Sequence, residues 1–256
     1  MRSILLTLLI VAIMLSASIS HARIEKENII GIWLFEEGKG KDVLDSSGNE
    51  HHGEINGAVK WVAGKIGGGL ECPGATGNFV NIPHHENLNL SAFTITYWCK
   101  MGVTAGWQIP VGKANGANRN FDFQTPANGG TVSLYFTQGA SQWKGVEATT
   151  IITDEKWHHI TGTYDLENLR IYVDGVMEKE SKYKGAPDHV DRSMTFGDME
   201  NAHPMKGVLD EVGIFSKAFS AEEIKVIMDR GLNIGANPVL SEGKLVATWA
   251  KVKTGQ

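Results

Sequence analysis

A turn-rich segment near the start of the chain carries closely spaced oxygen donors. Residues 45–53 read Asp-Ser-Ser-Gly-Asn-Glu-His-His-Gly, and carboxylate, amide and main-chain oxygens are the ligands that a hard cation such as calcium takes. The same residue types also form an Asx-turn, in which Asp45 accepts hydrogen bonds from the amides of Ser47 and Gly48. The segment therefore predicts either a cation loop or an ordinary turn.

Three histidine doublets raise the question of a zinc site: His51-His52, His84-His85 and His158-His159. Adjacent residues of a strand point to opposite faces, so one doublet does not easily supply two ligands to one ion. No cysteine pair and no helical His-x-x-x-His pattern accompanies them, so the sequence does not favour zinc.

Side chains suited to sugar recognition lie in the Gly- and Asn-rich loops of the middle of the chain. A sugar site needs aromatic rings that stack on C–H faces and polar groups that bond hydroxyls. The candidates are Trp107, Asn115, Asn118, Arg119, Gln138 and Trp143. The alternative for the two tryptophans is packing over the edge of the core. Trp33 and Trp98, on expected strands, are predicted to be core residues.

The elements that must position these residues are short strands. β-Branched and aromatic runs alternate with Gly, Asn, Asp and Pro, which is typical of strands and turns. The expected strands cover residues 29–35, 79–82, 93–100, 131–136, 158–164, 169–173 and 208–215. Between two of them, Asp174-Gly175 favours the positive φ values of a type I′ hairpin turn.

One helix is expected after the last of these strands. Ser220 and Glu223 have the spacing of a capping box, in which each side chain bonds the other residue's amide. Ile224 and Ile227 fall on one face, and Gly231 supplies the C-terminal stop. The pattern predicts a short helix that packs against the sheets and carries no chemistry.

The N-terminal residues indicate export. Met1-Arg2 is followed by an acid-free apolar run from Ile4 to Leu15 and by small residues that end at Ala22, the pattern of a signal peptide cleaved near residue 22. The run is too short to span a bilayer, which takes ~20 apolar residues. We therefore predict residues 1–22 as the signal peptide, a secreted or periplasmic location, and a mature chain with no membrane span.

Net charge and cysteine content further narrow the class of protein to which the chain can belong. The 256 residues carry a formal net charge of −5, and such an acidic balance argues against nucleic-acid binding, which needs clustered Lys and Arg. Cys72 and Cys99 are the only cysteines. In an oxidising compartment they can form a disulfide, or they can remain two buried thiols, because the sequence does not show whether their Cα atoms lie within ~7 Å.

Taken in order, several blocks of the chain resemble laminin-G-like domains. The matching blocks are residues 31–38, 45–53, 79–83, 93–98, 157–165, 171–175 and 209–215, followed by the helix entry at 218–224. The resemblance covers nearly all of residues 28–232 and implies an all-β fold of the concanavalin A-like lectin and glucanase group. That fold is a two-sheet antiparallel jelly roll with one short C-terminal helix. Residues 233–256 are predicted to be a linker and tail.

The resemblance also implies a structural calcium ion. Carried over by residue, its ligands are the side chains of Asp45, Asn49 and Asp210, with main-chain oxygens near Gly48 and His51. Members of the group include glycan-binding domains, protein-binding domains and enzymes, so the fold alone does not decide between them.

Hydrolysis is the main competing function within this fold. Related laminarinases carry carboxylates on one strand as Glu-x-Asp-x-x-Glu, and a retaining mechanism needs two carboxyl groups ~5–5.5 Å apart. The chain has no such run: Asp210 and Glu211 are adjacent and face opposite ways on a strand, while Asp165 and Glu167 precede a turn.

The sequence therefore predicts a secreted binding domain with no catalytic residue and with calcium as its one cofactor. Its partner is expected to be an extracellular carbohydrate or protein, and not nucleic acid. Two alternatives stay open: a polysaccharide hydrolase of the same fold, and a purely structural surface or adhesion domain.

Overall fold

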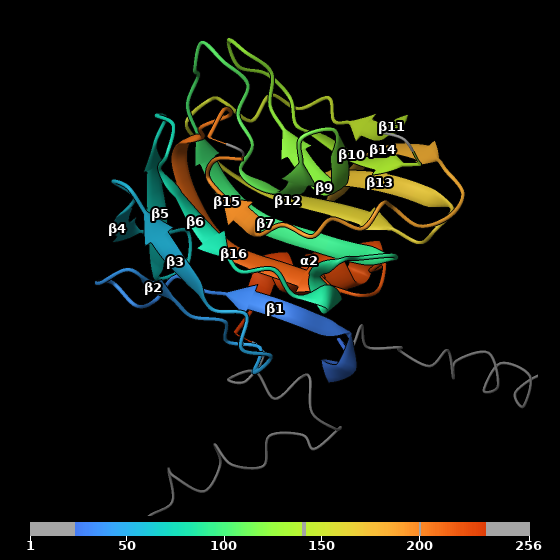
Figure 1. Ribbon diagram of the computed structural model, residues 1–256, viewed down its shortest axis with the longest axis horizontal. Coiled ribbons are helices and arrows are strands. Elements are labelled where there is room, and N and C mark those ends of the chain that lie inside the picture. The colour runs from blue at the N-terminus through green and yellow to red at the C-terminus, as the bar shows by residue number, and fades with distance from the viewer. Residues whose placement is uncertain (1–23, 140–141, 200, 234–256) are drawn as a thin grey trace, which may run out of the picture.

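Two antiparallel β-sheets packed face to face make up the structure, a computed structural model that describes residues 24–139, 142–199 and 201–233 (Figure 1). The elements are η1 (Lys26–Asn28), β1 (Ile29–Trp33), β2 (Asp42–Val43), β3 (Gly53–Asn56), β4 (Lys60–Ala63), β5 (Gly68–Pro73), β6 (Phe79–Ile82), η2 (Glu86–Leu88), β7 (Phe93–Met101), β8 (Val111–Asn115), β9 (Asn118–Gln124), β10 (Ser133–Gln138), β11 (Gln142–Glu147), β12 (Trp157–Tyr164), β13 (Asn168–Val173), β14 (Val176–Lys182), β15 (Met194–Phe196), β16 (Lys206–Phe215) and α2 (Ala221–Arg230).

The two sheets exchange strands along the chain, as a jelly roll requires. Sheet A has the order β14-β13-β12-β7-β16-β5-β4, with β1 also paired to β16. Sheet B has the order β11-β10-β9-β8-β15-β6-β3-β2. The fold class expected from the sequence, an all-β antiparallel sandwich with one helix, is confirmed.

Strand register in sheet B separates an inner face from an outer one. Directly paired residues share a face of a sheet, and neighbours along each strand alternate between faces. One row of partners across the sheet is apolar: Ile55, Val80, Phe196, Val111, and, further along, Phe123, Leu134 and Val146. These seven are buried in the core between the sheets.

The adjacent row of sheet B faces away from the core. Its paired positions are Glu54, Asn81, Thr195, Gly112, Asp122, Tyr135 and Gly145. Polar side chains and glycines take most positions of this row, so the pleat that builds the core also gives the far side of the sheet a polar character.

Aromatic packing fixes the middle of the sandwich. Trp33 is fully buried, and its ring lies 5.1 Å from that of Phe196 in an edge-to-face arrangement. Phe35 contacts the same Phe196 ring at 6.2 Å. Edge-to-face pairs of this kind stabilise a core beyond their buried area, so Phe196 anchors the three-residue strand β15 to the first strand of the chain.

The hairpin and the helix expected from the sequence are both present. Asp174 and Gly175 have φ values of 51° and 78°, as a type I′ turn requires, and they join β13 to β14. Ser220 and Glu223 form the capping box of α2, and Gly231 follows its last residue. The apolar face of α2 covers the outside of sheet A through Phe215 and its neighbours.

Two regions named by the sequence lie beyond what the structure places. The predicted signal peptide, residues 1–22, and residues 234–256 of the predicted tail fall outside the described residues. Within the described ranges, no helix has the length and apolar character needed to cross a membrane.

The disulfide considered from the sequence is absent, because Cys72 and Cys99 are two buried free thiols. Cys72 pairs with Gly207 of β16, and Cys99 pairs with Leu209 of the same strand from the opposite side. The two cysteines are thus separated by two inter-strand spacings, roughly 9.5 Å, which exceeds the ~7 Å limit for a disulfide.

Both thiols should therefore be unreactive until the protein unfolds. Burial raises the pKa of Cys72 to about 12, and burial also raises the pKa of Cys99 far above its usual range. Ellman titration should find no accessible thiol in the native protein and two in denaturant, and a reductant should leave the melting temperature unchanged. Two missing thiols in non-reducing denaturant would contradict this arrangement.

Candidate functional site: a pocket on the outer face of sheet B

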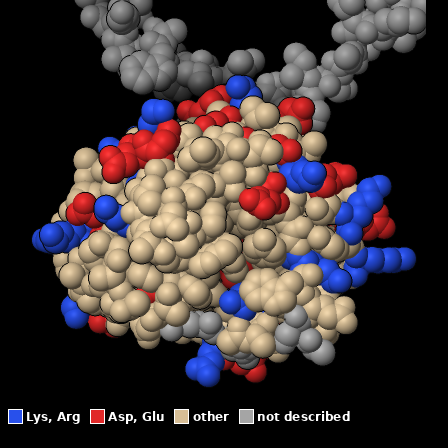
Figure 2. All heavy atoms as spheres, turned by 90° about the horizontal axis from the view of Figure 1, so that it is seen from above, with Lys and Arg blue, Asp and Glu red and all other residues tan. Residues whose placement is uncertain are grey.

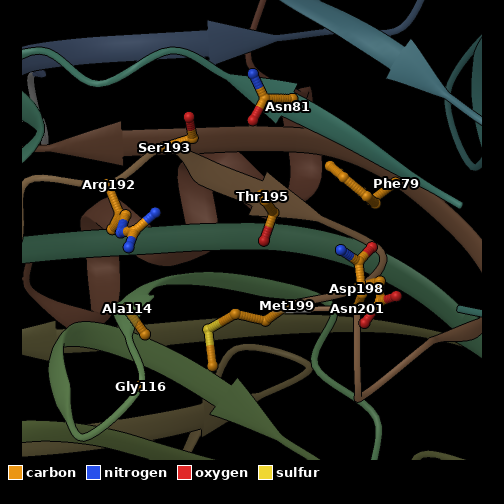
Figure 3. Close-up of a pocket in the computed structure, with 10 residues that line it drawn as sticks. All are labelled: Phe79, Asn81, Ala114, Gly116, Arg192, Ser193, Thr195, Asp198, Met199 and Asn201. Atoms are coloured by element: carbon orange, nitrogen blue, oxygen red, sulfur yellow. The ribbon is translucent and has the colours of Figure 1, made fainter. Parts of the chain in front are cut away.

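A pocket of about 720 Å³ lies on the outer face of sheet B, where β8, β15 and β6 run side by side (Figure 3). Asn81 and Thr195, which pair across β6 and β15, contribute polar groups to its floor. Its lining residues are Phe79, Asn81, Ala114, Gly116, Arg192, Ser193, Thr195, Asp198, Met199 and Asn201.

Most of this lining comes from one short stretch of chain. Residues 192–199 and 201 supply six of the ten lining residues, and they reach the site because β15 is inserted between β8 and β6. Figure 3 shows Arg192 and Asp198 on opposite sides of Thr195. The stretch therefore forms a wall at each end of the pocket and part of the floor between them.

Hydrogen bonds of Asp198 hold the wall at the end of the pocket opposite Arg192. One of its carboxylate oxygens accepts hydrogen bonds from the amides of Ala202 (3.2 Å) and His203 (2.9 Å), and the other accepts one from the amide of Gly77 (3.1 Å). Asp198 is almost completely buried and is the only acidic residue that lines the pocket. It shapes the wall, since its oxygens are already engaged by the main chain.

An apolar strip completes the floor. Ile109, Ala114 and Met199 form a small buried cluster outside the main core. Met199 lies over Gly112, where an added Cβ would come within 2.8 Å of its sulfur. Only glycine allows this close approach, and the result is a pocket with an apolar strip beside polar side chains, a common lining for small-molecule sites.

Two of the predicted ligand-binding residues, Arg119 and Trp143, lie beside this pocket. The Arg119 guanidinium stacks 4.2 Å from the Trp143 ring, and its Nη1 donates to the carbonyl oxygen of Gly116 on the pocket rim (2.7 Å). Its Nε donates to Asp122 at 2.6 Å. Arg119 is thus buried, and its donors are already bonded to Gly116 and Asp122. It links the pocket to Trp143, which is 47% exposed.

The other predicted residues lie elsewhere or have structural partners. The Gln138 amide donates to the carbonyls of Lys184, Gly185 and Ala186, so it anchors a loop. Trp107 is 46% exposed and precedes the bridge between Gln108 and Thr125.

That bridge lies just past the last residue of β9, whereas Asn118 is the first residue of the strand. At ~3.3 Å per residue, Trp107 is roughly 20 Å from the Arg119 end. The two tryptophans therefore belong to different surfaces. Asn118 lies in the strand pair β8–β9 opposite Asn115, whose side chain is outside the described part of the structure.

Asp45, the first residue predicted to bind calcium, forms the Asx-turn instead. Its Oδ1 accepts from the amides of Ile32 (3.0 Å) and Ser47 (2.9 Å), and its Oδ2 accepts from the Ser47 hydroxyl (2.8 Å) and the His51 amide (3.0 Å). Four donors occupy the carboxylate, and the turn ties the 45–53 segment to β1.

Of the other residues in the predicted calcium set, His51 contacts Asp45 through its amide and not through its carbonyl oxygen. Asn49 donates to the carbonyls of Ile29 and Ile30, while the carbonyl of His51 accepts from the Trp33 indole. Gly48 is exposed and lies in the turn with a positive φ of 89°.

Asp210 is engaged elsewhere. Its Oδ2 accepts from the amides of Lys65 and Ile66, and burial raises the pKa of this carboxyl to about 7. Its second oxygen is buried without a hydrogen-bond partner in the described structure. The side chains of Asp45, His51 and Asp210 do not form a cluster there with ligand atoms within 4.8 Å. The acidic and histidine side chains of the set therefore form no cation cluster by themselves, and the calcium site with its main-chain oxygens stays a prediction.

One group in the described ranges does have metal-ligand spacing. The Nε2 atom of His84 lies 3.5 Å from a Glu86 oxygen and 3.8 Å from an Asp191 oxygen. The other ring nitrogen of His84 contacts the Lys113 ammonium at 3.3 Å, so a buried cation already balances these exposed carboxylates. Histidines of two doublets also meet, because the rings of His51 and His85 lie 4.9 Å apart; the sequence pattern alone did not show these contacts.

Surface charge is mixed in sign. Figure 2 shows Lys and Arg side chains interspersed with Asp and Glu around the margin of the face it displays, with uncharged residues over the centre. Nucleic-acid binding depends on a continuous basic surface, which this face does not offer.

Comparison with known proteins agrees with this architecture. The family model described as the concanavalin A-like lectin/glucanases superfamily, of the laminin-G type, matches residues 74–225. The chain belongs to this superfamily. No curated protein matches the chain, so the family match and the solved structures carry the comparison.

Several solved structures share the fold. Domain 4 of AbnA, an extracellular GH43 arabinanase from Geobacillus stearothermophilus solved with arabinotriose, is 20% identical with a TM-score of 0.64, covering 80% of this chain and all of that one. The binding domain of Paraclostridial Mosquitocidal Protein 1 is 16% identical with a TM-score of 0.65, covering 79% of this chain and 52% of that one.

A botulinum neurotoxin type C structure, whose cell entry depends on two ganglioside molecules, is 14% identical with a TM-score of 0.64, covering 81% and 52%. The present chain therefore spans about half the length of the toxin structures that it matches. At these identities the likeness is one of fold.

Replacing Asp45 by alanine should destabilise the domain without any involvement of calcium. The change removes four hydrogen bonds to a charged acceptor and leaves the buried Ile32 amide unpaired, a loss of about 2 to 4 kcal/mol. Asp42→Ala, an exposed change nearby, should stay within about 0.5 kcal/mol of the parent. Unfolding free energies in calcium and in chelator should agree for all three proteins. A calcium-dependent rise that Asp45→Ala abolishes would establish the ion instead.

Proposed function

We propose that the chain is an exported, non-catalytic domain that binds a glycan in the pocket on the outer face of sheet B. The observation that carries the proposal is the pocket itself, of about 720 Å³, with hydrogen-bonding side chains on its floor and walls and an apolar strip beside them. Sugars present both hydroxyls and C–H faces, so a lining of both kinds is complementary to them.

The polar groups of the pocket have capacity for a ligand. Arg192 makes no hydrogen bond or ion pair with any residue that the structure describes, and its guanidinium holds five N–H donors. Ser193 and Asn201 add a hydroxyl and an amide at the same surface, while the Thr195 hydroxyl lies buried in the floor without a partner in the described structure. A ligand with several hydroxyl or carboxylate oxygens would satisfy these donors.

Trp143 would extend the site beyond the pocket. Its ring packs edge-on against Tyr135 at 5.6 Å and stacks with Arg119, yet nearly half of the side chain is exposed. A ring held by two neighbours in this way loses little freedom when a sugar stacks on it. We infer that a longer glycan would run from the pocket across Arg119 toward Trp143.

Carboxylate content supports binding without turnover. Glycoside hydrolysis by the common mechanisms uses two carboxyl groups, ~5 to 9.5 Å apart, and the pocket lining contains one, Asp198, whose two oxygens already accept three main-chain hydrogen bonds. Incubation with arabinan, glucan or galactan should therefore release no reducing sugar. The solved arabinanase domain that holds arabinotriose supports the choice of an arabinan ligand as the first probe.

Two pocket substitutions test the site directly. Asn81→Ala and Arg192→Ala each remove a hydrogen-bonding group from the lining and should weaken glycan binding by about tenfold or more, corresponding to about 1.4 kcal/mol or more. Binding would be measured on an array of arabinan, glucan, galactan and sialylated oligosaccharides, then by calorimetry. Melting temperatures should stay close to the parent value. Unchanged affinity in both variants would place the ligand elsewhere.

The two half-exposed tryptophans give a matched comparison. Trp143→Ala should weaken binding of oligosaccharides by about fivefold or more, because stacking area beside the pocket is lost, while Trp107→Ala should have no effect, since Trp107 lies at the other end of β9. Calorimetry with the same glycan measures both. A larger loss in Trp107→Ala would move the site to the 102–107 loop.

A further inference from the structure

The wall of the pocket at Arg192 belongs to an irregular segment, residues 186–193, here called the wall segment. It follows β14 and leads directly into β15, and its last two residues, Arg192 and Ser193, line the pocket. The segment has no regular secondary structure, so side-chain contacts must fix its course.

Its first anchor is Asp188. The amide of Asp188 donates to the carbonyl of Thr137 (2.8 Å), and its carboxylate accepts from the Thr137 hydroxyl (2.7 Å) and the Gly139 amide (2.8 Å). The buried Asn120 amide donates to the carbonyl of Asp188 at 3.0 Å. These bonds tie the start of the wall segment to β9 and β10.

Its second anchor is Val190, and it is made by two buried side chains. Asn89 Oδ1 accepts from the Val190 amide at 3.0 Å, and the Lys113 ammonium donates to the Val190 carbonyl and to Asn89 Oδ1 (3.0 Å). No main-chain hydrogen bond holds residues 191–193 among the parts of the chain that the structure describes. Val190 is therefore the last fixed point before Arg192 and Ser193.

Burying the charged side chain of Lys113 beside Val190 costs free energy. Lys113 is 0% exposed and lies on β8 opposite the core residue Phe121. Burial lowers its pKa to about 8, an effect opposed by the charges of Asp191 and Glu86. An apolar side chain would pack there without the cost of burying a charge. What the ammonium adds is a set of directed hydrogen bonds, to Val190, to Asn89 and to His84 (3.3 Å).

We propose that Lys113 and Asn89 are positioning residues of the pocket, which hold the main chain at Val190 and thereby set Arg192 and Ser193 against the ligand. The proposal deepens the proposed function and rests on it for its binding readout. Hydrogen exchange gives a second readout that needs no ligand.

Asn89 offers a conservative variant that separates the hydrogen bonds from the side-chain volume. Its Nδ2 is buried without a partner in the described structure, while Oδ1 makes both bonds. Asn89→Asp keeps the acceptor for Lys113 and Val190, replaces the unpartnered nitrogen by oxygen, and sets its added negative charge beside the Lys113 ammonium. Asn89→Ala and Lys113→Met remove the bonds. Ile171→Val, a buried change in sheet A away from the wall segment, controls for general loss of stability.

The experiment measures amide exchange by mass spectrometry and affinity by calorimetry, with arabinotriose or the array glycan of highest affinity as the probe. In Asn89→Ala and Lys113→Met, exchange of the Val190 amide, followed in the peptide that covers residues 189–193, should rise at least tenfold relative to the strands, and affinity should fall at least tenfold. Asn89→Asp should match the parent in both measurements, and Ile171→Val should change neither selectively.

Two results would overturn the proposal. One is exchange of the Val190 amide that stays at the parent rate, or that rises only in step with all strands, in Asn89→Ala and Lys113→Met. The other is faster exchange with undiminished affinity for the glycan. Failure of the parent protein to bind any glycan would instead reject the proposed function, and the exchange rates would still decide whether Lys113 and Asn89 hold the wall segment.

Discussion

Burial of Phe196 against Trp33 and Phe35 is the interaction on which the rest of the site depends. It holds β15, only three residues long, between β8 and β6 and so completes sheet B. Because neighbours in a strand point to opposite faces, the same packing turns Thr195 outward. The residues on either side of β15 then become the two walls of the pocket. The contact between Phe196 and Trp33 in the core thus fixes the position of the residues that line the pocket.

Much of the fold could be predicted from the sequence because its signals are local. The Asp174-Gly175 turn, the Ser220 capping box and the longer strands each depend on residues close in the chain. Strand β15 could not be found in this way, since three residues show no periodicity and its partners lie some 80 to 115 positions earlier. Strand order also determines that Cys72 and Cys99 form no disulfide, because β16 runs between their strands. No local sequence pattern reveals that order.

The candidate site shows the same division. Trp143 could be named from the sequence because an aromatic residue among polar neighbours is a local signal; the structure places it half-exposed on strand β11, not in a loop, and its role in binding stays a prediction. Arg119 and Gln138 look alike in the sequence as polar loop residues, yet their groups are already bonded to Gly116, Asp122 and the 184–186 carbonyls. Asn81, Arg192 and Thr195 were missed because they converge only through strand pairing. Asp45 illustrates the converse, since a pattern compatible with a cation serves as a hydrogen-bonded turn.

Mapping the ligand onto the main chain tests the central claim most directly. The ¹⁵N-labelled domain would be titrated with the array glycan of highest affinity while amide chemical shifts are followed. The account predicts that the largest shifts fall on β6, β8, β15 and the wall segment, with Asn81, Ser193 and Thr195 among them. Shifts concentrated on sheet A or on the 102–107 loop, or the absence of binding to any glycan, would contradict it.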